Sequence, residues 1–178
     1  MRDLMVDLET MDNKPTSAIV SIGAVFFDKT GLGPQFYKRV SLQSSMDAGL
    51  TVSGDTVMWW LKQSDPARLE LAKPAEDLRD VLVDFYRFIG LQSSHREVRV
   101  WGNGASFDNA ILQNAYSATN LTLPWEFWND RCYRTLKSMH PTVKLQRSGD
   151  YHNALDDARS QANHMLEFMG MHYGGKRI

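Results

Sequence analysis

The sequence contains a single cysteine, almost no net charge and no long apolar run, and each shortage excludes a class of protein. Cys132 alone cannot form an internal disulfide or a multi-cysteine zinc site. The 20 Lys and Arg residues are balanced by 21 Asp and Glu residues, which excludes a polybasic binder that works through bulk charge. No apolar run approaches the roughly 20 residues that span a bilayer, and residues 1–4 lack the apolar stretch of a signal peptide. We therefore expect a soluble, cytoplasmic protein without membrane contact.

The composition that remains is typical of a folded domain with a hydrophobic core, because 43% of the 178 residues are apolar and 11% are aromatic. We expect one domain over residues 1–170 and a tail over 171–178. Apolar periodicity predicts strands at 4–9, 18–27, 35–42 and 98–101, and helices at 54–63, 74–89, 106–118, 130–140 and 153–169. Pro74 is expected as a first helical residue and Ser106 as a helix cap. This order predicts an α/β fold whose mixed sheet opens with an antiparallel meander.

Asp7 and Glu9 are the first pair of candidate functional residues. They stand in a segment where Leu4, Val6 and Leu8 alternate with other residues, which predicts a half-buried strand. Side chains two residues apart in a strand point the same way, so the two carboxylates share one face. Their charges repel and raise each other's pKa unless a cation such as Mg²⁺ or Mn²⁺ lies between them. The alternative is a pair of solvated acids on an exposed strand face.

Asp108 is the second candidate, because it ends the segment WGNGASFD (101–108). This segment combines a strand end, a glycine-bearing turn and a helix start, a place where the strand fixes the position and the loop leaves space for a ligand. An acid in a first helical turn is also favoured by the helix dipole, whatever the function of the protein.

His152, Asp156 and Asp157 form the third candidate group, at the start of the last expected helix. An imidazole that titrates near neutral pH can accept a proton from water, although a histidine followed by acids is also an ordinary polar helix start. On a helical wheel, Asp156 and Asp157 lie on opposite flanks of the apolar stripe, so periodicity does not choose between them. Together, the three groups supply the acids and the base that a two-metal phosphodiester hydrolase needs.

Four segments resemble, in order, the motifs of the DEDDh 3′–5′ exonucleases of the DnaQ-like, ribonuclease-H-like superfamily. They are Asp7-Leu8-Glu9-Thr10, Ser21-Ile22-Gly23, Asn103 to Asp108, and His152 to Asp157. The resemblance implies a ribonuclease-H-like mixed β-sheet flanked by helices. It also implies metal-dependent hydrolysis from the 3′ end of DNA or RNA, single-stranded or overhanging, with release of nucleoside 5′-monophosphates and two Mg²⁺ or Mn²⁺ ions as cofactors.

The resemblance further implies a role for each matched residue. Asp7, Glu9, Asp108 and Asp157 match the four metal-binding acids, and His152 matches the general base. The family's H-x4-D spacing selects Asp157 over Asp156. The residues expected to bind substrate are Thr10, Met11, Asn103, Phe107 and Trp59.

One departure from the common pattern narrows the resemblance. Three residues separate Asn103 from the Phe-Asp pair, where proofreading members usually have two. Together with Trp59, Trp60 and Gln63, this spacing is similar to that of the phage DexA-type exonucleases and their bacterial relatives, which favours a free-standing enzyme. Family habit implies a homodimer. The main alternative is a catalytically idle module that binds nucleic-acid ends.

Other residues have a structural interpretation beside the functional one. Trp59 and Trp60 either stack on bases or pack at the rim of the core. A basic group either holds phosphates or forms a solvated face; it consists of Arg131, Arg134, Lys137, Lys144 and Arg147. The remaining histidines are expected at the surface, namely His95, His140, His164 and His172. Cys132 is expected to be a small buried hydrophobe.

Overall fold

A five-stranded sheet forms the centre of the computed structural model, which describes residues 1–149 and 151–173. The strand order is β3-β2-β1-β4-β5. The strands are β1 (Asp3–Thr10), β2 (Ile19–Asp28), β3 (Gly31–Arg39), β4 (Arg99–Gly102) and β5 (Asp130–Cys132). The first three pair antiparallel, and β4 and β5 extend the sheet from β1 in parallel. The predicted mixed sheet and its opening meander are confirmed.

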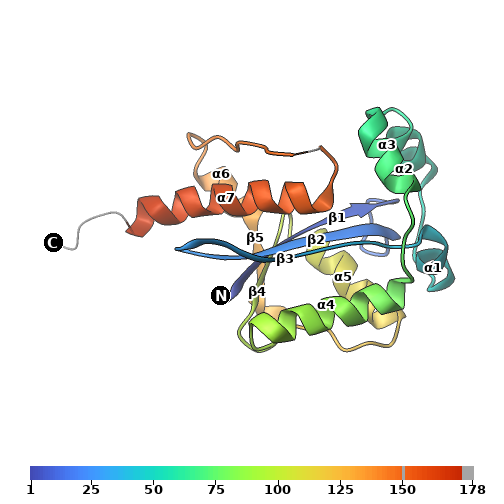
Figure 1. Cartoon of the computed structure of the whole chain (residues 1–178), viewed down its shortest axis with the longest axis horizontal. Coiled ribbons are helices and arrows are strands. Elements are labelled where there is room, and N and C mark those ends of the chain that lie inside the picture. The colour runs from blue at the N-terminus through green and yellow to red at the C-terminus, as the bar shows by residue number, and fades with distance from the viewer. Residues whose placement is uncertain (150, 174–178) are drawn as a thin grey trace.

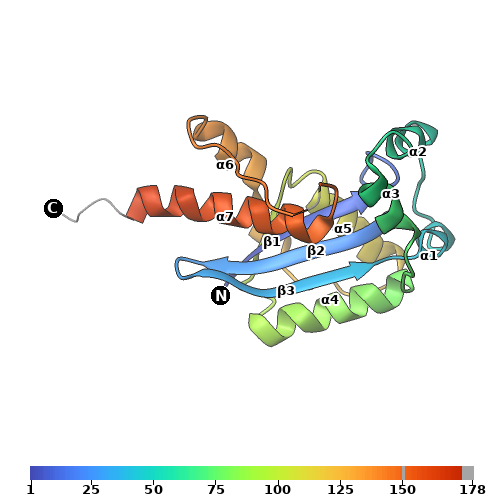
Figure 2. The same ribbon diagram turned by 45° about the horizontal axis from the view of Figure 1, so that its top comes forward.

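Helices cover both faces of the sheet and one of its ends (Figure 1). They are α1 (Leu42–Asp47), α2 (Gly54–Trp60), α3 (Asp65–Ala72), α4 (Leu78–Gln92), α5 (Asp108–Ala118), the short 3₁₀ helix η1 (Phe127–Asn129), α6 (Tyr133–Met139) and α7 (Ala154–Tyr173). Helices α6 and α7 lie on one face, α4 and α5 on the other, and α2 and α3 stand beyond the end toward which β1 runs (Figures 1 and 2). Among the described helices, none is long and apolar enough to cross a membrane.

The central strand β1 is buried on both faces, whereas its alternation predicted one buried face. Leu4 and Val6 belong to the core that the sheet forms with α4 and α5. Met5 points the opposite way, into a second core with Ala158 and Phe168 of α7. The half-buried expectation is therefore wrong, because α7 covers the face on which the two predicted acids lie.

Two predicted helix starts are wrong, and at one of them a side-chain cap sets the boundary. Helix α4 begins at Leu78 rather than at Pro74, since the Asp77 carboxylate accepts a hydrogen bond from the backbone N–H of Arg79 at 2.8 Å. Ser106 does not cap α5, which begins at Asp108 with Phe107 in the cap position.

Other boundaries shift by several residues. The expected helix at 130–140 is divided into β5 and α6, and the third strand lies at 31–39 instead of 35–42. Helices α1 and α3 were not predicted. Helix α7 continues through residue 173, and residues 174–178 of the predicted tail lie outside the described residues.

Gly23 allows α7 to approach the sheet very closely. It lies opposite Asp7 in the pairing of β1 with β2. A methyl group added at Gly23 would lie 2.1 Å from the backbone carbonyl carbon of Ala154, the first residue of α7. No side chain fits at that distance, so the glycine determines how near the start of α7 comes to the acid-bearing strand.

We predict that Gly23→Ala lowers the free energy of unfolding by about 3 kcal/mol, because α7 must move away from the sheet or strain its first turn. Urea unfolding measures this loss. Gly54→Ala is the matched control: in the described part of the chain, nothing lies within 4 Å of the methyl group it adds. Its expected effect is within about 0.5 kcal/mol. Equal stability of the two variants would contradict the close packing.

Candidate active site

Asp7 and Glu9 lie on the face of β1 that α7 covers, near the carboxyl end of the strand. Gln161 of α7 donates a hydrogen bond from its Nε2 to Asp7 Oδ1 at 2.7 Å, which fixes one oxygen of that carboxylate. Glu9 is only 8% exposed. The shared face predicted from the strand period is therefore an enclosed one, and the interpretation of two solvated acids does not apply.

Asp108 approaches this pair from the first residue of α5. Its side chain is buried, and its Oδ2 atom has no hydrogen-bond partner among the described residues. A methyl group at Gly102 would lie 2.9 Å from the Asp108 Cβ atom, so the glycine at the end of β4 leaves space for this carboxylate. The next residue, Asn109, donates to the Val100 carbonyl at 3.0 Å and to Asp130 at 2.8 Å. These bonds attach the start of α5 to β4 and β5.

Asp157, in the first turn of α7, completes the cluster. The polar atoms of Glu9, His152 and Asp157 all lie within 4.8 Å of one another. Asp156 forms an ion pair with Arg159 of the same helix at 3.5 Å. The docking of α7 thus brings Asp157, rather than Asp156, to the acids of β1. The helical wheel did not distinguish these two residues.

His152 is held in an unusual backbone conformation between aromatic rings. Its φ angle is 62°, a region that residues other than glycine rarely adopt. Its ring centroid lies 5.0 Å from that of Trp59 and 5.8 Å from that of Trp60, edge-on to both. The indole Nε1 of Trp60 in turn donates to the Thr10 carbonyl at 3.0 Å. Backbone strain maintained by surrounding contacts is typical of functional sites.

Burial raises the pKa of every acid in the cluster, and repulsion by neighbouring carboxylates raises it further for Asp7 and Glu9. The pKa of Asp7 is raised well above its usual value by burial and then by the charges of Asp108, Glu9 and Asp157. Burial, Asp157 and Asp108 raise the pKa of Glu9 to about 8. Burial raises the pKa of Asp108 to about 7 and also raises that of Asp157, against the opposing charge of Arg147.

The cluster fits divalent cations. Near neutral pH, four such acids cannot all be ionised unless positive charge compensates them. The donors are carboxylate oxygens, which Mg²⁺ and Mn²⁺ prefer. The buried Asp108 Oδ2, which no described donor satisfies, would be available to a cation as an additional ligand atom.

The residues expected to bind substrate differ in whether their side chains are exposed and free to contact a ligand. Trp59 is 43% exposed and borders His152. Asn103 is half-buried beside Asp108, and Phe107 packs against the core. The Thr10 hydroxyl donates to the Asp12 carbonyl at 2.9 Å, and Met11 is buried. For Thr10 and Met11, the side chains are therefore committed to the fold.

Sequence reasoning missed two residues at the site and misplaced two others. It did not single out Gln161, although Gln161 follows Asp157 by one helical turn and so lies on the same side of α7. Nor did it find Gly23 as the contact point of α7. His164 was expected at the surface but is buried, and Cys132 was expected to be buried but is half-exposed. Tyr133 donates to His164 Nδ1 at 2.6 Å, and His164 Nε2 donates to the Val143 carbonyl at 3.1 Å.

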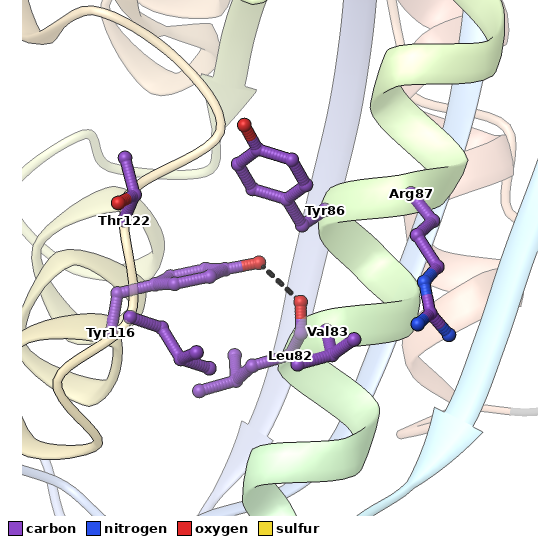
Figure 3. Close-up of a pocket in the computed structure, with 7 residues that line it drawn as sticks. Leu82, Val83, Tyr86, Arg87, Tyr116 and Thr122 are labelled. Atoms are coloured by element: carbon purple, nitrogen blue, oxygen red, sulfur yellow. Dashed lines mark hydrogen bonds between the residues drawn. The ribbon is translucent and has the colours of Figure 1, made fainter.

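A separate cavity of about 350 Å³ lies between α4 and the end of α5, on the opposite face of the sheet (Figures 1 and 3). Tyr116 donates a hydrogen bond to the Leu82 carbonyl at 2.8 Å inside it. Its described lining is mainly apolar and contains no carboxylate; it consists of Leu82, Val83, Tyr86, Arg87, Tyr116, Leu121 and Thr122. This cavity has no part in the acid cluster.

Comparison with known proteins finds nucleases of related architecture. An exodeoxyribonuclease of enterobacteria phage T4 is 24% identical over an alignment of 165 residues, which covers 76% of this chain and 70% of that protein. The nuclease domain of 3′hExo, a DEDDh family member bound to rAMP, matches with a TM-score of 0.63 and 14% identity over 95% of this chain and 92% of that one. Pop2p of S. pombe, with Mg²⁺ and Mn²⁺ bound, matches with a TM-score of 0.65 and 15% identity over 99% and 86%. The solved structures establish the ribonuclease-H-like fold.

The family model of the 3′–5′ exoribonuclease Rv2179c-like domain matches residues 2–169, a range that includes all four acids of the cluster. A match of this extent covers both the scaffold and the candidate active site. The chain therefore belongs to the Rv2179c-like family and is a 3′–5′ exonuclease of the DEDDh, DnaQ-like type.

Proposed function

We propose that the protein hydrolyses phosphodiester bonds from the 3′ end of a nucleic acid by a two-metal mechanism and releases nucleoside 5′-monophosphates. The observation that carries this proposal is the convergence of four buried or half-buried carboxylates from β1, α5 and α7, with an imidazole beside them. When bound, the two Mg²⁺ or Mn²⁺ ions supply charge compensation for the scissile phosphate and lower the pKa of a water molecule.

Each residue of the cluster has a proposed task. Asp7, Glu9, Asp108 and Asp157 hold the cations, and Gln161 orients Asp7 through its hydrogen bond. His152 accepts the proton of the attacking water on an imidazole nitrogen. The water oxygen bonds to phosphorus as the bond between phosphorus and the 3′-oxygen of the penultimate nucleotide breaks. The phosphate stays on the released nucleotide, and the 3′-oxygen takes up a proton to become a hydroxyl.

Trp59 and the backbone of residues 10–11 are proposed to receive the terminal nucleotide, with Asn103 and Phe107 on the Asp108 side. Trp59 is exposed next to His152, which suits stacking on a base. Thr10 and Met11 are better placed to contribute main-chain groups, because their side chains are engaged or buried. Arg134 near Asp108 and Arg147 near Asp157 add positive charge on two sides.

Single-stranded RNA is the substrate that we propose first, because the family that matches this chain is described as exoribonucleases. The T4 relative is named an exodeoxyribonuclease, so DNA is the direct competitor. The predicted homodimer has no bearing on this choice, and light scattering on the purified protein would test it.

We predict that Asp7→Asn and Asp157→Asn each lower turnover by about three orders of magnitude or more while the fold survives. Loss of one of several repelling charges relieves repulsion, so the melting temperature in chelator should not fall. The assay follows 5′-labelled single-stranded RNA and DNA of equal sequence, with Mg²⁺ or with chelator, as a ladder that shortens from the 3′ end.

Asp156→Asn is the matched control for this experiment, because Asp156 lies in the same helical turn but pairs with Arg159. It should retain most of the activity. Equal damage by Asp156→Asn and Asp157→Asn would overturn the assignment of the metal ligand. A folded wild-type protein that binds both oligonucleotides and shortens neither would instead support the idle end-binding module.

A second prediction concerns pH. The folded-state pKa values of Glu9 and Asp108 are raised to about 8 and about 7, so the folded chain binds more protons than the unfolded chain between about pH 4.5 and pH 8. Stability in chelator should therefore be greatest near pH 5 and should fall as the pH rises to 8. Mg²⁺ should raise the melting temperature more at pH 8 than at pH 5, because protons no longer compete for the carboxylates.

Thermal unfolding in chelator and in Mg²⁺ at the two pH values measures both effects. Glu9→Gln is the control, since it removes one titrating group and should flatten the fall in chelator. A Mg²⁺-induced shift that is as large at pH 5 as at pH 8 would contradict the proposed site.

Trp59→Ala should raise KM about tenfold with little change in melting temperature, because a stacking platform at the surface is lost. Trp60→Phe is the comparison, because it removes the buried hydrogen bond to the Thr10 carbonyl and should lower the melting temperature. Steady-state kinetics with labelled oligonucleotide and thermal unfolding separate the two effects. An unchanged KM in Trp59→Ala would show that Trp59 is only a packing residue.

A further inference from the structure

Arg147 places a positive charge directly on the acid cluster. Its Nη1 atom pairs with Asp157 Oδ1, the carboxylate that α7 contributes. The arginine side chain is 38% exposed, whereas that of Asp157 is 13% exposed. The ion pair therefore joins a solvent-accessible cation to one of the proposed metal ligands.

The backbone around Arg147 is fixed on both sides, although residues 140–149 form neither helix nor strand. His164 of α7 donates to the Val143 carbonyl at 3.1 Å. The backbone N–H of Ser148 donates to the Ser160 hydroxyl, also on α7, at 3.0 Å. The side chain of Arg147, by contrast, is partly exposed, and its guanidinium carbon lies 5.3 Å from the centre of the Tyr151 ring. A different rotamer would therefore reposition the charge without moving the segment.

A guanidinium and a divalent cation compete for the same carboxylate. The guanidinium and the cation must each lie close to the carboxylate, and at that distance their positive charges repel each other. Each therefore binds Asp157 more weakly while the other is bound. A freed guanidinium has five N–H donors in a planar fork, a geometry that matches a phosphate group. It would lie at the rim of the site where the proposed substrate carries its phosphates.

We propose that Arg147 is an exchangeable counter-ion, which gives up Asp157 to a divalent cation and then contacts a backbone phosphate of the nucleic acid next to the scissile one. The proposal rests on the proposed function, since it assumes that Asp157 is a metal ligand. Arg147 is thus a residue that weakens cation binding to the free protein and strengthens substrate binding.

The first test measures cation binding without substrate, by calorimetric titration of Mn²⁺ into chelator-stripped protein. Arg147→Ala should bind Mn²⁺ about three- to tenfold more tightly than the wild type, because the competing charge is gone. Arg147→Lys keeps the charge but not the fork, and it should remain near the wild type. Arg159→Ala is the matched control, because it removes an equal charge paired with the adjacent acid Asp156, and its affinity should not change.

The second test measures KM and kcat separately for a single-stranded oligonucleotide at saturating Mn²⁺. In Arg147→Ala, KM should rise about tenfold while kcat changes by less than about threefold. Arg147→Lys should recover part of the loss in KM, and Arg159→Ala should match the wild type. Circular dichroism confirms that each variant is folded.

The outcomes separate this inference from the function on which it rests. Unchanged or weaker Mn²⁺ binding in Arg147→Ala would overturn the competition, and an unchanged KM would overturn the phosphate contact. A wild type that takes up no Mn²⁺ would instead refute the proposed metal site itself.

Discussion

The repulsion among four carboxylates enclosed at the end of β1 is the constraint on which the rest of the structure depends. Burial raises the pKa of Asp7, Glu9, Asp108 and Asp157, and neighbouring carboxylates raise it further for Asp7 and Glu9, so the convergence of the four acids is unfavourable unless cations compensate it. Only a rigid scaffold can hold such groups together. The central position of β1 in the sheet, and the helices that cover both of its faces, supply that rigidity.

Close approach of separate elements is what assembles the cluster. Gly23 lets the start of α7 contact the sheet, and Gly102 leaves space for the Asp108 carboxylate at the start of α5. At both positions an added methyl group would displace the element that carries an acid. Gly23 and Gly102 thus contribute to function because their small size allows a neighbouring element to place its acid in the cluster.

The sequence allowed prediction of those features that depend on local periodicity. The shared face of Asp7 and Glu9 follows from the strand period, and the opening meander follows from three apolar segments with short connections. The choice between Asp156 and Asp157 depends on how α7 docks on the sheet. Gly23 sets that docking although it lies more than 130 residues earlier in the sequence, so no local pattern contains the information. His164 illustrates the same limit, because its burial results from Tyr133 and the Val143 carbonyl, which no helical pattern reveals. The predicted start of α4 was wrong because its cap, Asp77, lies outside the apolar stripe from which the helix was predicted.

Stability and function draw on different parts of the fold. Between the sheet and α4, aromatic rings pack closely, with the Phe36 and Phe85 ring centroids 5.1 Å apart, and the buried Tyr116 hydroxyl donates to the Leu82 carbonyl. The end of β1, where the starts of α5 and α7 meet, contains the unsatisfied Asp108 oxygen and the strained backbone of His152. A buried polar atom without a partner and a residue in a sparsely populated region each destabilise the fold by about 1–3 kcal/mol. Such features persist when the surrounding packing over-determines them, and the apolar face of the same strand provides that packing. Two of the departures from ideal folding, at Asp108 and His152, therefore lie where a substrate and its cations would gain most from them.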